Sequence, residues 1–84
     1  MSEQELLGSI ATFLHERTGV ARDELTLDTD LVGSRLLDSF GVIELFFLME
    51  SLLGRPLDVT GFTLEAVGTP RTIHRRFFSQ SLEG

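Results

Sequence analysis

The sequence predicts an all-α fold: a small bundle of three main helices and one short helix, with a long ordered loop between the first and second helices. Three observations carry this prediction. Apolar residues recur at helical spacing in three segments, a serine, threonine or aspartate stands at the start of each, and no stretch alternates apolar and polar residues as a strand does. Because 84 residues supply one compact core, we expect residues 1–84 to form a single domain.

The first helix is expected over residues 3–18. Ser2 and Glu5 have the spacing of a capping box, in which each side chain accepts from the backbone amide of the other residue. Arg17 suits the negative carboxyl end of the helix, and Gly19 is a typical left-handed end. The apolar face consists of Leu6, Leu7, Ile10, Phe13 and Leu14.

Residues 19–38 are expected to form an ordered loop that lies across the helices. A connection of this length without anchors of its own would be unusual in a small domain. The sequence supplies six apolar anchors, and it allows a short helical turn around Leu25 or Leu31. The anchors are Leu25, Leu27, Leu31, Val32, Leu36 and Leu37.

The second helix is expected from Ser39 to Leu53, where Gly54 ends it. At 3.6 residues per turn this helix has two apolar faces. The core face consists of Val42, Leu45, Phe46, Met49, Leu52 and Leu53. The opposite face consists of Phe40, Ile43, Glu44, Phe47 and Ser51. Either the long loop covers this second face or the face is an exposed docking patch, and the adjoining Ser39 favours docking.

The last third of the chain holds the two remaining helices. A short helical turn is expected over residues 63–67, capped by Thr63. Thr69 caps the last helix, whose first residue is Pro70, where the missing N–H costs nothing. This helix is expected to fade near residues 79–81. Its inner stripe consists of Ile73, Phe77 and the adjacent Phe78.

The chain is acidic, with a net charge of −6 and seven arginines as its basic side chains. This charge disfavours nucleic-acid binding and suggests partners with basic docking surfaces, although acidity also keeps small proteins in solution. There is no cysteine, so any thiol chemistry has to come from an added group. No apolar run is long enough for a membrane span, and we expect a cytoplasmic monomer.

Ser39 stands where the loop turns into the second helix. A serine at such a junction is most often the N-cap, although Asp38 can cap instead and leave the Ser39 hydroxyl outward. A catalytic nucleophile is disfavoured, because the G-x-S-x-G elbow is absent and the only imidazole bases, His15 and His74, are remote in sequence.

Asp28 and Asp30 begin a partial match to a calcium-binding EF-hand loop. The fifth position of that match is Val32, and the twelfth is Ser39 rather than a bidentate glutamate. We therefore expect solvated charges or turn formers here, and no metal site.

The chain resembles the discrete acyl carrier and peptidyl (aminoacyl) carrier proteins, which are phosphopantetheine-attachment domains, along nearly its whole length. The matching features are the length, the acidity, the helix order with its long first loop, the Leu37-Asp38-Ser39-Phe40 junction, the following Glu44-Leu45 and the short helix before Thr69-Pro70.

The resemblance implies a non-catalytic protein that serves as a substrate of partner enzymes. A phosphopantetheinyl transferase would attach 4'-phosphopantetheine from coenzyme A to Ser39. A loading ligase or adenylation enzyme would then charge the arm with an acyl or aminoacyl thioester, for a downstream acyltransferase, synthase or tailoring enzyme. The resemblance also implies that partners dock on Asp38, Phe40, Ile43, Glu44 and Phe47, with Val67 bordering the same surface.

Some positions depart from the family pattern. Leu36 stands where many members have glycine, and Gly41 stands where carriers for fatty acid synthesis often have an acidic residue. Room for a partner or for the arm is one hypothesis for this glycine. Only Glu44 and Glu50 charge the second helix, which favours a carrier of secondary metabolism (polyketide or nonribosomal peptide type) or a D-alanyl carrier of cell-wall modification. From another class, the alternative is an unmodified helical adaptor that binds a partner through Phe40, Ile43 and Phe47.

Overall fold

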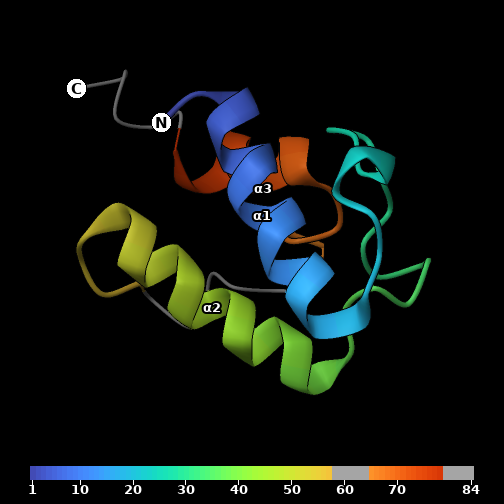
Figure 1. The fold of residues 1–84 in the computed structure, drawn as a ribbon. Helices are drawn as coiled ribbons and strands as arrows, with labels where there is room; N and C mark the ends of the chain where they lie inside the picture. Colours follow the sequence, from blue (N-terminus) through green and yellow to red (C-terminus); the bar gives the residue numbers. More distant parts are fainter. Residues whose placement is uncertain (58–64, 79–84) are drawn as a thin grey trace.

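The computed structural model describes residues 1–57 and 65–78, and over these ranges the chain is all-helical. The helices are α1 (Glu3–Thr18), the 3-10 helix η1 (Arg22–Glu24), α2 (Ser39–Leu53) and α3 (Pro70–Phe77). α1 packs against α3, and α2 forms the other side of a small bundle (Figure 1). The predicted all-α bundle is confirmed. None of the helices in the described ranges has the length and apolar character needed to cross a membrane.

α1 and α2 begin and end where the sequence predicts, and α3 begins where it predicts but ends at Phe77, before the expected residues 79–81. The amide of Glu5 donates to the Ser2 hydroxyl over 3.1 Å, and the amide of Ser2 donates to the Glu5 carboxylate over 2.9 Å. Gly19 ends α1 in the left-handed conformation, with φ of 83°. The capping box at the start of α1 is thus formed in full. At the start of α3, which is Pro70, the Thr69 side chain caps the first turn.

The core forms where the apolar faces of the three helices meet the long loop. α1, α2 and α3 each contribute side chains without solvent exposure, and so do the long loop and the segment before α3. The largest fully buried side chains are Leu6, Ile10, Leu14, Leu31, Leu45, Met49, Val67, Pro70 and Ile73. The predicted stripe of α1 packs into this cluster, and so does the predicted core face of α2, with one exception. Phe46 lies outside the cluster with its ring against Phe47, and Leu48 packs on the core instead.

The loop between α1 and α2 is ordered, as predicted. Leu25, Leu31 and Leu37 anchor it in the core. Its backbone also bonds to the chain around the start of α3, because the Leu31 amide donates to the Gly68 carbonyl over 2.8 Å and the Arg71 amide donates to the Leu27 carbonyl over 3.0 Å. These bonds satisfy backbone groups that a loop packed against a core would otherwise leave unpaired.

The position of the short helix differs from the prediction. Residues 65–67 form a turn rather than a helix, and residues 63 and 64 lie outside the described ranges, as do residues 79–81, where α3 was expected to fade. In the part of the chain that the structure describes, the short helical element is η1. It ends directly before Leu25, one of the two places where the sequence allows such a turn.

A side-chain clasp between the loop and α3 makes stability depend on pH. The Arg71 guanidinium binds Asp28 through two hydrogen bonds of 2.9 and 3.2 Å, and this bonding lowers the pKa of the Asp28 carboxyl. A carboxyl whose pKa is lower in the folded state stabilises the fold above its ordinary pKa, and that contribution is lost as the pH falls through the folded-state pKa.

We therefore expect Asp28→Asn to lower the melting temperature at neutral pH, by an amount that shrinks as the pH falls through the folded-state pKa of the Asp28 carboxyl. Thermal unfolding of both chains across this pH range measures the effect. A difference in melting temperature that persists undiminished in acid would show that the clasp contributes through packing and not through charge.

Candidate functional site

Ser39 is the first residue of α2, and its side chain is exposed. Asp38 is the N-cap: its carboxylate accepts from the Gly41 amide over 2.7 Å. Of the two alternatives at this junction, the structure therefore has the second, in which Asp38 caps and the Ser39 hydroxyl is left outward. Within the described ranges this hydroxyl forms no hydrogen bond, and it is accessible to a reagent or an enzyme.

Arg17 reaches from the last turn of α1 to the first turns of α2 and pairs with two carboxylates there. One guanidinium nitrogen lies 3.0 Å from Asp38 Oδ1, and another pairs with Glu44 Oε1. The side chain of Arg17 is only 24% exposed, against 69% for Asp38 and 55% for Glu44. The hydrogen bond from the Gly41 amide, followed by the one from Arg17, lowers the pKa of Asp38.

This pairing changes the interpretation of Glu44. The resemblance implies that Glu44 meets a basic residue of a partner, whereas in this structure Arg17 already pairs with it. Sequence reasoning missed the contact, because Arg17 was assigned to the negative end of its own helix. No local spacing signals the contact, since Glu44 lies 27 positions further along the chain.

Gly41 is the residue that lets Arg17 lie against α2. A Cβ at this position would lie 3.1 Å from Arg17 Nε, 3.2 Å from Asp38 Oδ1 and 3.3 Å from Leu37 Cδ2. Gly41 is buried and faces these side chains. The hypothesis that it makes room for a partner or for the arm is therefore wrong, because the space is already filled from within.

We expect Gly41→Leu to destabilise the fold by about 1–3 kcal/mol, because the added atoms overpack the site and displace Arg17. Gly8→Ala is the matched control, since nothing lies within 4 Å of a Cβ at that position in the interior of α1. Alanine there should stabilise the chain by about 0.5–1 kcal/mol. Urea unfolding of both variants measures the two effects. If Gly41→Leu had the same free energy of unfolding as the wild type, Gly41 would not be tightly packed.

Three large apolar side chains stand exposed on one stripe of α2. Phe40 is 74% exposed, Ile43 53% and Phe47 60%. We call these three residues the α2 patch. The alternative that the long loop covers this face is therefore wrong. Val67, which was expected to border the same surface, is fully buried, so its side chain is out of reach of a docking partner.

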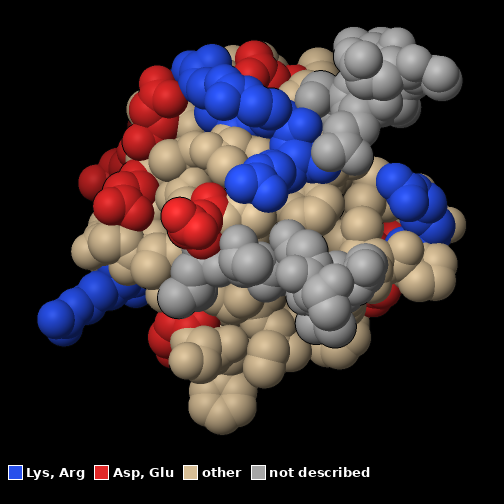
Figure 2. All heavy atoms as spheres, turned by 180° about the vertical axis from the view of Figure 1, so that it is seen from behind, with Lys and Arg blue, Asp and Glu red and all other residues tan. Residues whose placement is uncertain are grey.

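Charge is distributed unevenly over the surface. Figure 2 shows acidic side chains along one flank of the face opposite to the view of Figure 1, and basic ones gathered at the top of that face. Three of the seven arginines belong to α3, namely Arg71, Arg75 and Arg76. The net charge of the chain therefore does not by itself fix the charge of a partner at the α2 patch.

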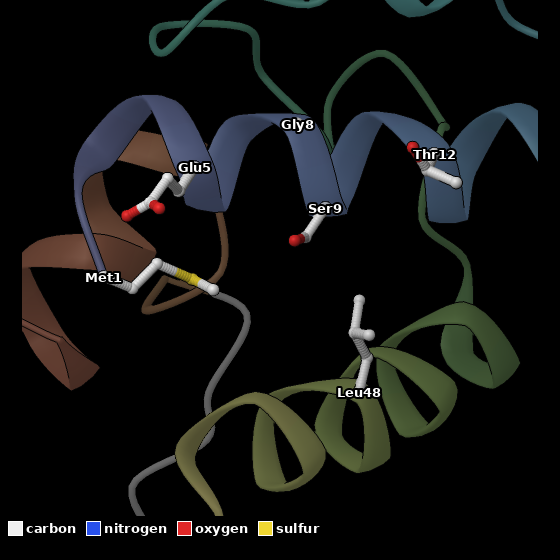
Figure 3. Close-up of a pocket in the computed structure, with 6 residues that line it drawn as sticks. All are labelled: Met1, Glu5, Gly8, Ser9, Thr12 and Leu48. Carbon is white, nitrogen blue, oxygen red and sulfur yellow. The ribbon is translucent and has the colours of Figure 1, made fainter.

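A hollow of about 580 Å³ lies between α1 and α2, away from Ser39 (Figure 3). Its lining residues are Met1, Glu5, Gly8, Ser9, Thr12 and Leu48. The one carboxylate among them, Glu5, accepts from the Ser2 amide, and the bonds with Ser2 lower its pKa. This hollow therefore presents apolar side chains, two hydroxyl groups and a carboxylate already engaged in a cap.

The two histidines bond to backbone carbonyls. A ring nitrogen of His15 lies 2.9 Å from the Val20 carbonyl oxygen, and one of His74 lies 2.8 Å from that of Met1. Within the described residues neither ring is hydrogen-bonded to Ser39, so no serine–histidine pair is formed there.

The loop aspartates are engaged as well. Asp28 binds Arg71, while Asp30 accepts from the Gly33 amide over 2.7 Å as a turn former. Over residues 1–57 and 65–78 no group of three or more histidine, aspartate or glutamate side chains could hold a metal ion.

Comparisons with protein-family models, with curated proteins and with solved structures gave no match.

Proposed function

We propose that this chain is a stand-alone acyl or aminoacyl carrier protein that holds its cargo as a thioester on a phosphopantetheine arm attached to Ser39. The observation that carries the proposal is the state of this serine. Asp38 takes over the cap, so the Ser39 hydroxyl is exposed and unbonded at the start of α2, directly beside the α2 patch.

The surroundings of Ser39 suit a phosphodiester. The N-terminus of a 15-residue helix presents amide N–H groups and the positive end of the helix dipole to an anion. Asp38 bonds the Gly41 amide, which leaves the amides of Ser39 and Phe40 without a partner in the described part of the chain. Arg17 pairs with Asp38 and so reduces the repulsion between this carboxylate and a phosphate next to it.

The chain's own role is nucleophilic attack by Ser39 and presentation of the arm. The serine Oγ forms a bond to phosphorus while the pyrophosphate P–O bond of coenzyme A breaks. The hydroxyl proton passes to the transferase, and adenosine 3',5'-bisphosphate leaves. The bound arm supplies the thiol that a chain without cysteine lacks. Loading and consuming enzymes would dock on the α2 patch.

The composition of α2 supports a pathway class. Glu44 and Glu50 are its only charged residues, and Glu44 is paired within the chain. Such an apolar helix suits a cytoplasmic carrier in polyketide- or nonribosomal-peptide-type biosynthesis, and a D-alanyl carrier of cell-wall modification is the alternative within the same class.

Intact-protein mass spectrometry after incubation with coenzyme A and a broad-specificity phosphopantetheinyl transferase tests the proposal. We expect a single added phosphopantetheine on the wild type and on Ser51→Ala, a control at an exposed serine of the same helix. We expect none on Ser39→Ala. A folded wild-type chain that gains no mass, while a carrier protein of known activity is modified in the same reaction, would refute the proposal.

The α2 patch also favours a second candidate, an unmodified adaptor that binds a partner through Phe40, Ile43 and Phe47. The two candidates differ at Ser39. An adaptor keeps its binding partner after Ser39→Ala, whereas a carrier with this substitution holds no cargo.

A further inference from the structure

We propose that Arg17 is a positioning residue that sets the chemistry of the docking surface beside Ser39, so that this surface takes partner enzymes with an apolar pocket rather than a basic one. The inference rests on the proposed carrier function and names the kind of partner that the carrier fits.

The first support is the pairing of charges around the modification site. Asp38 precedes Ser39, Glu44 flanks the α2 patch, and the Arg17 guanidinium binds both carboxylates. Two negative charges therefore share one positive charge together with the positive end of the α2 dipole, which is worth about half a unit charge. Because the Arg17 side chain is only 24% exposed, salt screens this pairing less than it screens a pair in which both side chains are exposed.

The second support is the backbone that accommodates the pairing. Gly41 leaves no side chain where Arg17 Nε passes, and a Cβ there would lie 3.1 Å from that nitrogen. A glycine in the first turns of a helix weakens the helix relative to alanine. The packing around Gly41 supplies the reason for it, so the arginine's approach to α2 is built into the helix.

The consequence concerns the partner's docking face. Phe40, Ile43 and Phe47 follow one another at helical spacing and form an apolar stripe. A partner that covers this stripe meets carboxylates at its edge that already hold a counter-ion. Without Arg17 the same partner would have to desolvate two carboxylates that lack a counter-ion, which weakens an apolar interface. A basic partner would instead gain two free anions to bind.

The sign of the effect of Arg17→Gln separates these cases. We would measure KM and kcat of a broad-specificity phosphopantetheinyl transferase for the chain, at saturating coenzyme A and at low and high salt. We expect Arg17→Gln to raise KM about 3- to 10-fold at both salt concentrations, and Arg17→Lys to restore KM toward the wild-type value. Arg22→Gln, an exposed arginine of η1 that alters the net charge equally, should behave as the wild type.

A lower KM for Arg17→Gln at low salt, lost at high salt, would overturn the inference, because a basic partner would then be binding the released carboxylates. The wild type gives an independent test, should the variant fail to fold. We expect its KM to change less than about twofold with salt, whereas a steep rise would overturn the inference. A wild-type chain that is not modified at all refutes the proposed function itself, which is a separate result.

Discussion

Phe47→Glu is expected to slow transfer between the carrier and its partner enzymes by about 10- to 100-fold while the fold stays intact. The side chain is 60% exposed on the α2 patch, so the core loses little when it is replaced. At an interface, a central aromatic anchor contributes about 2 kcal/mol or more, and each 1.4 kcal/mol is a factor of ten. A carboxylate would also have to be buried in an apolar pocket without a partner.

The measurement is kcat/KM of the phosphopantetheinyl transferase for the variant, together with thermal unfolding followed by circular dichroism. Gln4→Glu is the matched control, because it adds the same charge at an exposed polar position of α1, outside the α2 patch. A large decrease in the melting temperature of Phe47→Glu would place this side chain in the core. Equal rates for both variants would remove Phe47 from the docking surface.

Leu45→Ala is expected to have the opposite profile, with a large loss of stability. Leu45 lies on the core face of α2 and has no solvent exposure. Truncation of a buried leucine costs about 2–5 kcal/mol. At about 0.05–0.15 kcal/mol per residue, a chain of 84 residues is stable by about 4–13 kcal/mol, so the variant loses a large fraction of its stability.

Urea unfolding measures this loss, with Leu45→Met as the control, since it conserves volume and should cost less than about 1.5 kcal/mol. If Leu45→Ala were as stable as the wild type, α2 would not be packed on the core through this face. The comparison of Leu45 with Phe47, two positions apart, therefore tests the orientation of α2, which decides what Ser39 and the α2 patch present to a partner.

The local features of the fold could be predicted from the sequence because local rules determine them. The capping box of Ser2 and Glu5 and the glycine at position 19 fix α1, and the periodicity of α2 separates Leu45 and Met49 from Phe40 and Phe47. The sequence allows either Ser39 or Asp38 to cap α2, and in the structure Asp38 is the cap.

Contacts between distant segments could not be predicted in this way. Arg17 bonds residues 21 and 27 positions further on, and a helical charge pattern contains no information about such pairs. The need for glycine at position 41 could not be predicted either, because the side chain that occupies the space beside it comes from another helix. Val67 was placed at the surface by resemblance, while its burial follows from how the segment before α3 packs on the core.

Peptide mapping of the modified chain by tandem mass spectrometry tests the central claim most directly. After reaction with coenzyme A and the transferase, we expect phosphopantetheine on the peptide that contains Ser39, with fragment ions that place it on this residue. Ser34, Ser51 and the other hydroxyl side chains should be unmodified. Phosphopantetheine on another residue, or on none while a carrier protein of known activity is modified alongside, would contradict the account.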